Sequence, residues 1–153
     1  MMMRSWKRAR LWLSVAAVLS FAGMALGAPV DAELRRRAEQ GEPDAQYRMG
    51  VAHSKGEGAV RDDVEAAGWF IRAAEGGHPE AQFILGLLYS SGLGVPQDDV
   101  MALMWLRVSA AWSAGEDRAL AMSLADGISI RMSPAQIEEA QRRAVRCLPP
   151  SDT

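Results

Sequence analysis

The side chains able to do chemistry in this chain are two histidines, one cysteine and two pairs of adjacent aspartates. His53 and His78 have no second histidine or cysteine at the spacing of a metal-binding set, so we interpret both as structural. Asp62–Asp63 and Asp98–Asp99 could supply acid–base carboxylates or bind a metal. Each pair stands where a helix is expected to begin, and carboxylates there cap free N–H groups. Both pairs are therefore predicted to be helix caps.

Two further candidates have structural interpretations as well. Ser133 stands directly before a proline, which is typical of a helix N-cap and not of a strained nucleophile turn. Cys147 is the only cysteine and has no mate for an internal disulfide. We expect it to be a half-buried packing residue near the end of the last helix, with an intermolecular disulfide as the alternative. The sequence predicts no catalytic, cofactor-binding or metal site, and hence no enzyme.

The charge distribution argues against nucleic acid as a partner. The chain has 153 residues and a net charge of -2, but the first 27 residues contain four of its 17 basic residues and no acid. The remainder has 13 basic and 19 acidic residues, a net charge of -6. Phosphate binding depends on clustered lysine and arginine, which this acidic remainder lacks.

The amino terminus has the order of a secretory signal. A basic start reaches Arg10, an apolar run follows from Leu11 to Leu26, and small residues surround the end of that run. We predict a signal peptide over residues 1–27, cleaved after Gly27, which places the protein in the periplasm or outside the cell with no membrane contact. An uncleaved membrane anchor is the alternative, because a spanning helix needs roughly 17 to 25 apolar residues.

An internal repeat predicts the fold. The segment from Pro43 to His78 aligns without gaps on the segment from Pro79 to Ala114, and 13 of the 36 positions are identical. Chance would give about two or three identities at ordinary residue frequencies. Apolar residues recur with helical period in each half of the unit, so each copy is predicted to be a pair of helices joined by a turn.

Each repeated residue has a physical role in such a hairpin. A mid-helix glycine allows close approach of the second helix, a Gly-x-Gly segment forms the turn, an aspartate caps the second helix, and a tryptophan packs between hairpins. In the first copy the aspartate is expected to form a reciprocal capping box with Glu65. The structural signature consists of Gly50, Gly56, Gly58, Asp62 and Trp69, and of their counterparts Gly86, Gly92, Gly94, Asp98 and Trp105.

The flanks of the two copies complete a single domain over residues 28–148. Residues 31–42 resemble the second half of a unit and predict a leading half-repeat. Residues 115–148 predict a divergent capping hairpin, with a first helix over 116–125 that ends at Gly127. Ser133 and Gln136 have the spacing of a capping box for its second helix. Residues 149–153 are a polar tail.

These residues resemble the Sel-one-like repeat (SLR) family, whose members are related to tetratricopeptide (TPR) repeats. The second copy carries the resemblance best, and the first departs from it at His53 and at Ala59-Val60. The resemblance covers about residues 32–147. It implies an all-α, right-handed α-solenoid of about seven helices after the signal segment, acting as a bacterial scaffold for protein–protein interaction, without cofactor or catalytic motif. The matching motif residues are Ala81, Gln82, Leu85, Gly86, Tyr89, Gly92, Gly94, Val95, Asp98, Ala102 and Trp105.

The helical positions that the repeat leaves free define the expected partner site. Arg48, Val51, Ile84 and Leu87 are predicted to line a concave groove that takes a protein or peptide, unless Ile84 and Leu87 pack against the next hairpin instead. The expected form is a monomer, or a dimer linked through Cys147. A peptidoglycan- or glycan-binding module is the alternative function, and a small hydrolase a second alternative.

Overall fold

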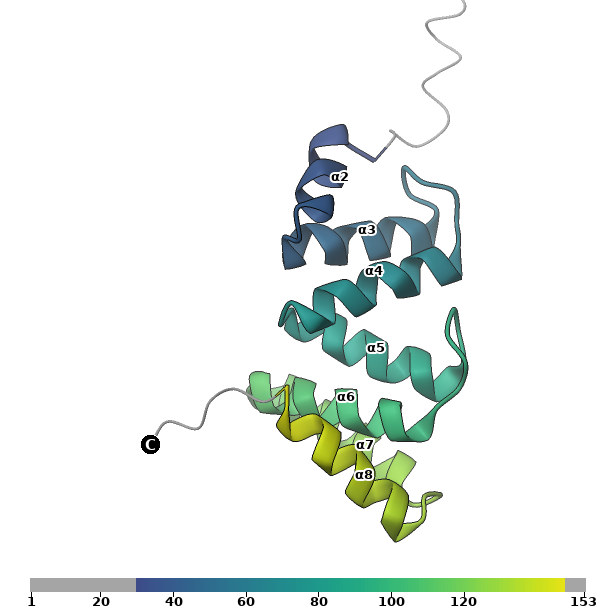
Figure 1. Ribbon diagram of the computed structural model, residues 1–153, viewed down its shortest axis with the longest axis vertical. Helices are drawn as coiled ribbons and strands as arrows, with labels where there is room; N and C mark the ends of the chain where they lie inside the picture. The colour runs from purple at the N-terminus through teal and green to yellow at the C-terminus, as the bar shows by residue number, and fades with distance from the viewer. Residues whose placement is uncertain (1–29, 148–153) are drawn as a thin grey trace, which may run out of the picture.

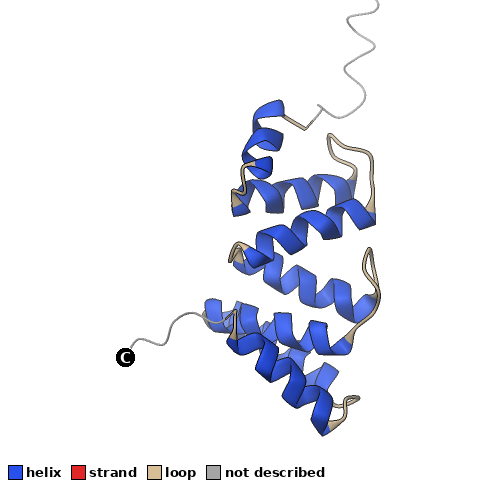
Figure 2. Ribbon diagram, viewed as in Figure 1, coloured by secondary structure: helices blue, strands red, loops and turns tan. Residues whose placement is uncertain are grey.

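The computed structural model describes residues 30–147, and this part of the chain consists of seven α-helices without a β-strand (Figures 1 and 2). The predicted signal peptide and the polar tail lie outside the described residues. In chain order the helices are α2 (Ala32–Glu39), α3 (Pro43–Lys55), α4 (Asp63–Glu75), α5 (Pro79–Ser91), α6 (Asp99–Trp112), α7 (Gly115–Ser129) and α8 (Pro134–Val145).

The helices stack along the long axis of the molecule, each against the next along the chain from α2 to α7 (Figure 1). The hairpins α3–α4 and α5–α6 are the two complete units, and α2 covers the free side of α3. This arrangement confirms the prediction of an all-α solenoid of about seven helices. Most of the core lies between α4, α5 and α6, where the second hairpin is covered on both sides.

The first helix of each hairpin begins and ends as the sequence predicts. Pro43 and Pro79 occupy the first turn, where a missing N–H leaves no bond unmade. Gly56 (φ 73°) and Gly92 (φ 75°) end these helices in the left-handed conformation that a glycine adopts without steric cost.

Asp62 and Asp98 cap the second helices, which confirms their structural interpretation. A carboxylate oxygen of Asp62 accepts from the N–H groups of Val64 (2.9 Å) and Glu65 (3.0 Å). Asp98 accepts in the same way from the second and third residues of α6, at the same two distances. The four aspartates are thus distributed along the solenoid at helix starts, as caps and first-turn acids.

The predicted reciprocal bond from Glu65 to the backbone of Asp62 is wrong. The N–H of Asp62 donates instead to the carbonyl of His53 near the end of α3 (3.1 Å). The N–H of Asp98 likewise donates to the carbonyl of Tyr89 (2.9 Å). This bond across the turn occupies the donor that a capping box would use, and it links the two helices of each hairpin.

The mid-helix glycines allow close helix packing. A Cβ atom at Gly50 would lie 2.7 Å from the ring of Phe70, and one at Gly86 would lie 2.7 Å from Cγ of Leu106. The second helix of each hairpin therefore fills the space that the glycine leaves. Trp69 and Trp105 are each 5% exposed, as expected for packing residues.

A buried glutamine links each first helix to the helix before it. Gln46 donates its side-chain amide to the carbonyl of Ala38 at the end of α2 (3.1 Å). Gln82 makes the equivalent bond to Ala74 at the end of α4 (3.3 Å). Helix ends carry carbonyls without helical partners, so a buried side-chain donor stabilises the junction between units.

The turn of the second hairpin also packs back onto the first. Gly94 (φ 71°) lies so close to the backbone carbonyl of Asp63 that a Cβ atom would overlap it, and the same atom would approach Ala67 to 3.1 Å. The equivalent turn of the first hairpin accepts a backbone bond at Gly58 from the N–H of Val30 (2.8 Å). Each turn is therefore seated on the chain of the preceding unit.

The last two helices depart from the predicted capping hairpin. α7 does not end at Gly127 but continues to Ser129, because the next residue, Ile128, is buried there while Gly127 faces open space. The capping box of Ser133 and Gln136 at the start of α8 is confirmed. α7 and α8 each pack on α6, with little contact between them, so the third pair is splayed across α6.

Candidate partner-binding groove

A groove of about 260 Å³ lies between the first helices α3 and α5 and the start of α7. Apolar side chains of α3, α5 and α7 line it together with two serines and two carboxylates. We call it the first-helix groove; it is lined by Tyr47, Pro79, Glu80, Phe83, Ile84, Ser109, Ser113, Asp117 and Leu120. Ser109 of α6 and Ser113, which directly follows that helix, also line it, so all units from the first hairpin to α7 contribute.

The aromatic side of the groove is held in place by stacking. Tyr47 stacks on the His78 ring with centroids 4.4 Å apart and an interplanar angle of 13°. Its other neighbour is Phe70, at 5.9 Å and tilted. His78 is fixed in turn because its Nδ1 accepts from the N–H of Ala81 at the start of α5 (3.3 Å). This inter-repeat position agrees with a structural role for His78.

The charged side chains of the groove are acidic. Glu80 and Asp117 lie on its rim, and no lysine or arginine is among the residues that line it. Leu120 on α7 is 52% exposed and offers an apolar contact beside the two carboxylates. The groove is therefore complementary to a segment that combines an apolar side chain with a basic one.

The structure places one of the four expected site residues in this groove. Ile84 lines it and is partly buried against the core. Val51 also packs against the core, and Leu87 is 38% exposed. Arg48 is exposed and does not line the groove. The predicted set therefore spans both the groove and the ridge beside it.

The groove lies on the flank between neighbouring first helices and not on their outward ridge. Successive helical residues differ by about 100° around the axis, so Tyr47 points about 100° away from Arg48 and toward α5. Phe83 holds the same position one repeat later. An aromatic residue recurring at the repeat period, one position before the free ridge, was the sequence signal for this flank.

The remaining candidate residues have separate surroundings. Nδ1 of His53 lies 3.3 Å from the carbonyl oxygen of Val60 in the hairpin turn. Cys147 is exposed because it follows the end of α8, so the expectation of a half-buried thiol is wrong. The backbone carbonyl of Cys147 accepts a hydrogen bond from the indole N–H of Trp112 (3.2 Å). Within the described residues, no cluster of His, Cys, Asp or Glu could hold a metal ion.

None of the helices between residues 30 and 147 is both long and apolar enough to cross a bilayer.

The fold is a short α-solenoid of helical hairpins, with one groove between its first helices. The sequence model of the family described as Sel1 repeat matches residues 43–78 and 79–111. The chain thus contains two Sel1 repeats and has the SLR fold. Sel1 repeats generally mediate protein–protein interaction and are typically non-catalytic scaffolds.

Two solved structures show the same fold. One is the protein c5321, described as a protective antigen present in uropathogenic Escherichia coli strains and displaying an SLR fold. The two sequences are 29% identical and the TM-score is 0.67. The match covers 74% of this chain and 24% of c5321. The other is a Sel1 repeat protein from Oxalobacter formigenes, 38% identical with a TM-score of 0.55 over 60% of this chain and 26% of that one.

The chain therefore covers about a quarter of each of these solved structures. Comparison with the curated proteins finds no match.

Proposed function

We propose that this protein is an exported bacterial interaction module that binds a peptide or a protein surface in the first-helix groove, as an adaptor or regulator of an envelope or signalling protein. The observation that carries the proposal is the groove itself, which is lined by the apolar side chains of Phe83 and Ile84 together with acidic side chains. Arg48, Val51 and Leu87 do not line the groove, and we propose that those of them that are exposed, Arg48 and Leu87, extend the contact beside it.

The chemistry of the groove suggests the kind of segment it takes. The cavity has room for a few side chains, not for a folded domain. Glu80 and Asp117 would pair with a lysine or arginine of that segment, while Phe83 and Leu120 would contact an apolar residue next to it. Export rests on the basic, apolar and small-residue order of residues 1–27.

Site-specific photo-crosslinking in living cells would test the proposal. A benzoylphenylalanine at Phe83 keeps the phenyl ring of the native residue and places the reactive benzophenone carbonyl in the groove. The matched control is the same group at Val64, which is 69% exposed on α4 and outside the groove. We expect a discrete crosslinked partner in the envelope fraction from position 83 and not from position 64. Identical products from the two positions, or none from position 83, would contradict the proposal.

Substitutions then separate the groove from the ridge. We expect Ile84→Asp to reduce crosslinking at least about tenfold, because it removes the apolar side chain that an apolar residue of the partner would contact in the groove. Arg48→Ala and Leu87→Ala should reduce it less. Amino-terminal sequencing of the same material tests cleavage after Gly27. A groove that captures peptidoglycan fragments and no protein would favour the glycan-binding alternative, although one face of the Tyr47 ring is already covered by His78.

A further inference from the structure

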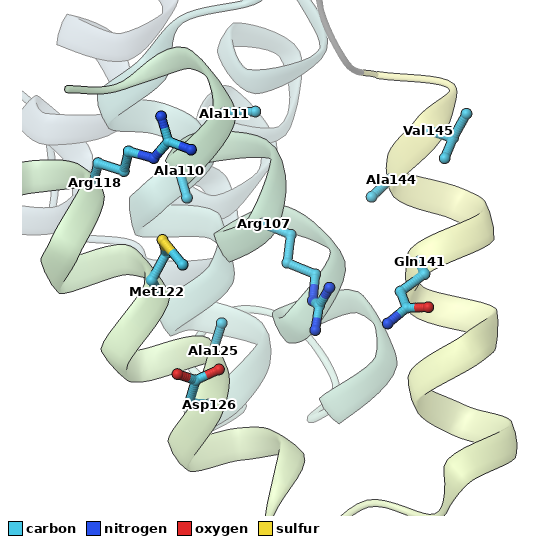
Figure 3. A pocket seen from close by; sticks show the side chains of 10 residues that line it. All are labelled: Arg107, Ala110, Ala111, Arg118, Met122, Ala125, Asp126, Gln141, Ala144 and Val145. Atoms are coloured by element: carbon cyan, nitrogen blue, oxygen red, sulfur yellow. The ribbon is translucent and has the colours of Figure 1, made fainter.

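A second and larger hollow lies on the splayed terminal pair, and it shares no lining residue with the first-helix groove. It has a volume of about 420 Å³ and runs between α7 and α8, with α6 beneath it (Figure 3). The hollow exists because α7 and α8 each pack on α6 and leave the space between them open. We call it the terminal trough.

The charge of the terminal trough is opposite to that of the first-helix groove. Arg107 from α6 and Arg118 from α7 line it, together with one acid, Asp126. Figure 3 shows the guanidinium of Arg107 lying in the space between α7 and α8. Two arginines against one carboxylate give a local excess of positive charge in a chain whose residues after the first 27 are acidic overall.

Arg107 is held without the partners that arginine usually has. Its Nε is buried and has no hydrogen-bond partner among the described residues. Other arginines of the same region are paired: Arg131 with Asp99, and Arg142 and Arg143 with Glu139. A buried guanidinium N–H without an acceptor is costly, and a carboxylate accepts from such a donor in a charge-assisted bond.

The rest of the terminal trough is apolar. Met122 on α7 is 49% exposed and Val145 on α8 is 67% exposed, and alanines of α6, α7 and α8 form the surface between them. Exposed apolar side chains on both walls, above an arginine, suit a ligand that has an apolar group next to an anionic one. Gln141 offers a further amide on the α8 side.

We propose that the terminal trough is a second binding site, which takes a peptide segment of a partner protein with a glutamate or aspartate beside an apolar residue. The carboxylate accepts hydrogen bonds from Arg107 and is attracted by Arg118, and the apolar side chain packs between Met122 and Val145. This site does not depend on occupation of the first-helix groove. With the two sites together, one short solenoid would bind a basic segment and an acidic segment at once.

The test uses defined peptides and nuclear magnetic resonance. The probe is the peptide Ala-Leu-Glu-Leu-Ala-Tyr, acetylated and amidated so that the glutamate is its only charge, and the control peptide has glutamine in place of glutamate. Titration into the isotope-labelled chain from residue 28 to 153 reads the Nε–H signal of Arg107 and the amides of α7 and α8. We expect the glutamate peptide to shift these signals and to bind at least about tenfold more tightly than the glutamine peptide.

Variants connect the binding to named side chains. Arg107→Met keeps most of the side-chain volume and should weaken the glutamate peptide at least about tenfold. Asp126→Asn removes the acid of the trough and should strengthen binding about threefold, because a like charge is lost. The matched control is Arg146→Gln, an exposed arginine outside the trough, which should change the affinity by less than about twofold.

The outcomes separate clearly. Equal affinity for the two peptides, no binding of either, or unchanged affinity in Arg107→Met would overturn the proposal. If Arg107→Met does not fold, weaker binding by Asp126→Asn would overturn it equally well. Ile84→Asp in the first-helix groove should leave this titration unchanged, so failure of one site does not imply failure of the other.

Discussion

The contact between Gly94 and the preceding hairpin offers a measurable test of how the units are joined. Replacement of Gly94 by alanine introduces two costs. The first is the left-handed backbone (φ 71°), which costs a residue with a Cβ roughly 1–2 kcal/mol. The second is the overlap of the new Cβ with the carbonyl of Asp63, a backbone atom that cannot rotate away. Overpacking of this kind costs about 1–3 kcal/mol more.

The matched control is Gly77→Ala, because Gly77 has φ 88° and its Cβ would meet nothing within 4 Å. It introduces the backbone cost alone, about 1–2 kcal/mol. Urea unfolding followed by circular dichroism at equal protein concentration should show Gly94→Ala less stable than Gly77→Ala by about 1–3 kcal/mol. Equal stability of the two variants would refute the view that the turn is seated on the first hairpin.

Two further predictions concern the helix caps and the terminal pair. Asp62→Ala should lower the free energy of unfolding by about 1 kcal/mol, because two cap hydrogen bonds are lost. Glu65→Ala should change the free energy of unfolding by less than about 0.5 kcal/mol. Urea titration of both variants checks these values. The hydrogen bonds from Arg131 hold the pKa of Asp99 below its ordinary value. The pair therefore stabilises the fold fully at a pH above the unfolded pKa of Asp99, about 4. This stabilisation is lost as the pH falls through the lower pKa that Asp99 has in the folded state. Arg131→Gln should therefore be less stable than the original chain by under about 1 kcal/mol at pH 7. Unfolding curves at successively lower pH should show this difference in stability disappear. A difference that persists at pH 2 would contradict this account.

The repeated part of the fold could be predicted because its residues act locally. Pro43, Gly56 and Asp62 each determine a helix end through backbone geometry or a nearby hydrogen bond, and the same types recur at the same spacing in the second copy. Gly50 and Gly86 indicated close helix packing, because glycine destabilises a helix interior relative to alanine unless a neighbouring element needs the space. Signals of this kind depend on neighbours in the sequence and not on the rest of the fold.

The parts that sequence reasoning missed depend on contacts between distant residues. The capping box at Glu65 failed because the carbonyl of His53 already occupies the Asp62 donor, across a turn whose closure the spacing alone does not reveal. Gly127 did not end α7 because burial of Ile128 on α6 favours one more turn of helix. The splay of α7 and α8 follows from the same long-range packing.

The sequence predicted the candidate groove only in part, because the position of the groove also depends on contacts between distant residues. Periodicity identified the helical positions that the repeat signature leaves free, and Ile84, which lines the groove and packs partly against the core, was among them. It could not show that the hollow lies between neighbouring helices, on the side of Tyr47 and Phe83, because this depends on how far apart α3, α5 and α7 stand. The two walls of the terminal trough, α7 and α8, belong to the divergent segment, where no repeat was available as a guide, and only its base on α6 lies in the second repeat.

Helix α6 carries three neighbours, since α5, α7 and α8 all pack against it, and it contributes more buried side chains than any other helix between residues 30 and 147. Local opening in such a structure follows the number of neighbours that must be lost. Amide hydrogens of α6 should consequently be the last to exchange with solvent, and those of the short α2 among the first. Both proposed sites include residues of α6, so we expect each to keep one slowly opening wall even when the N-terminal end of the solenoid opens.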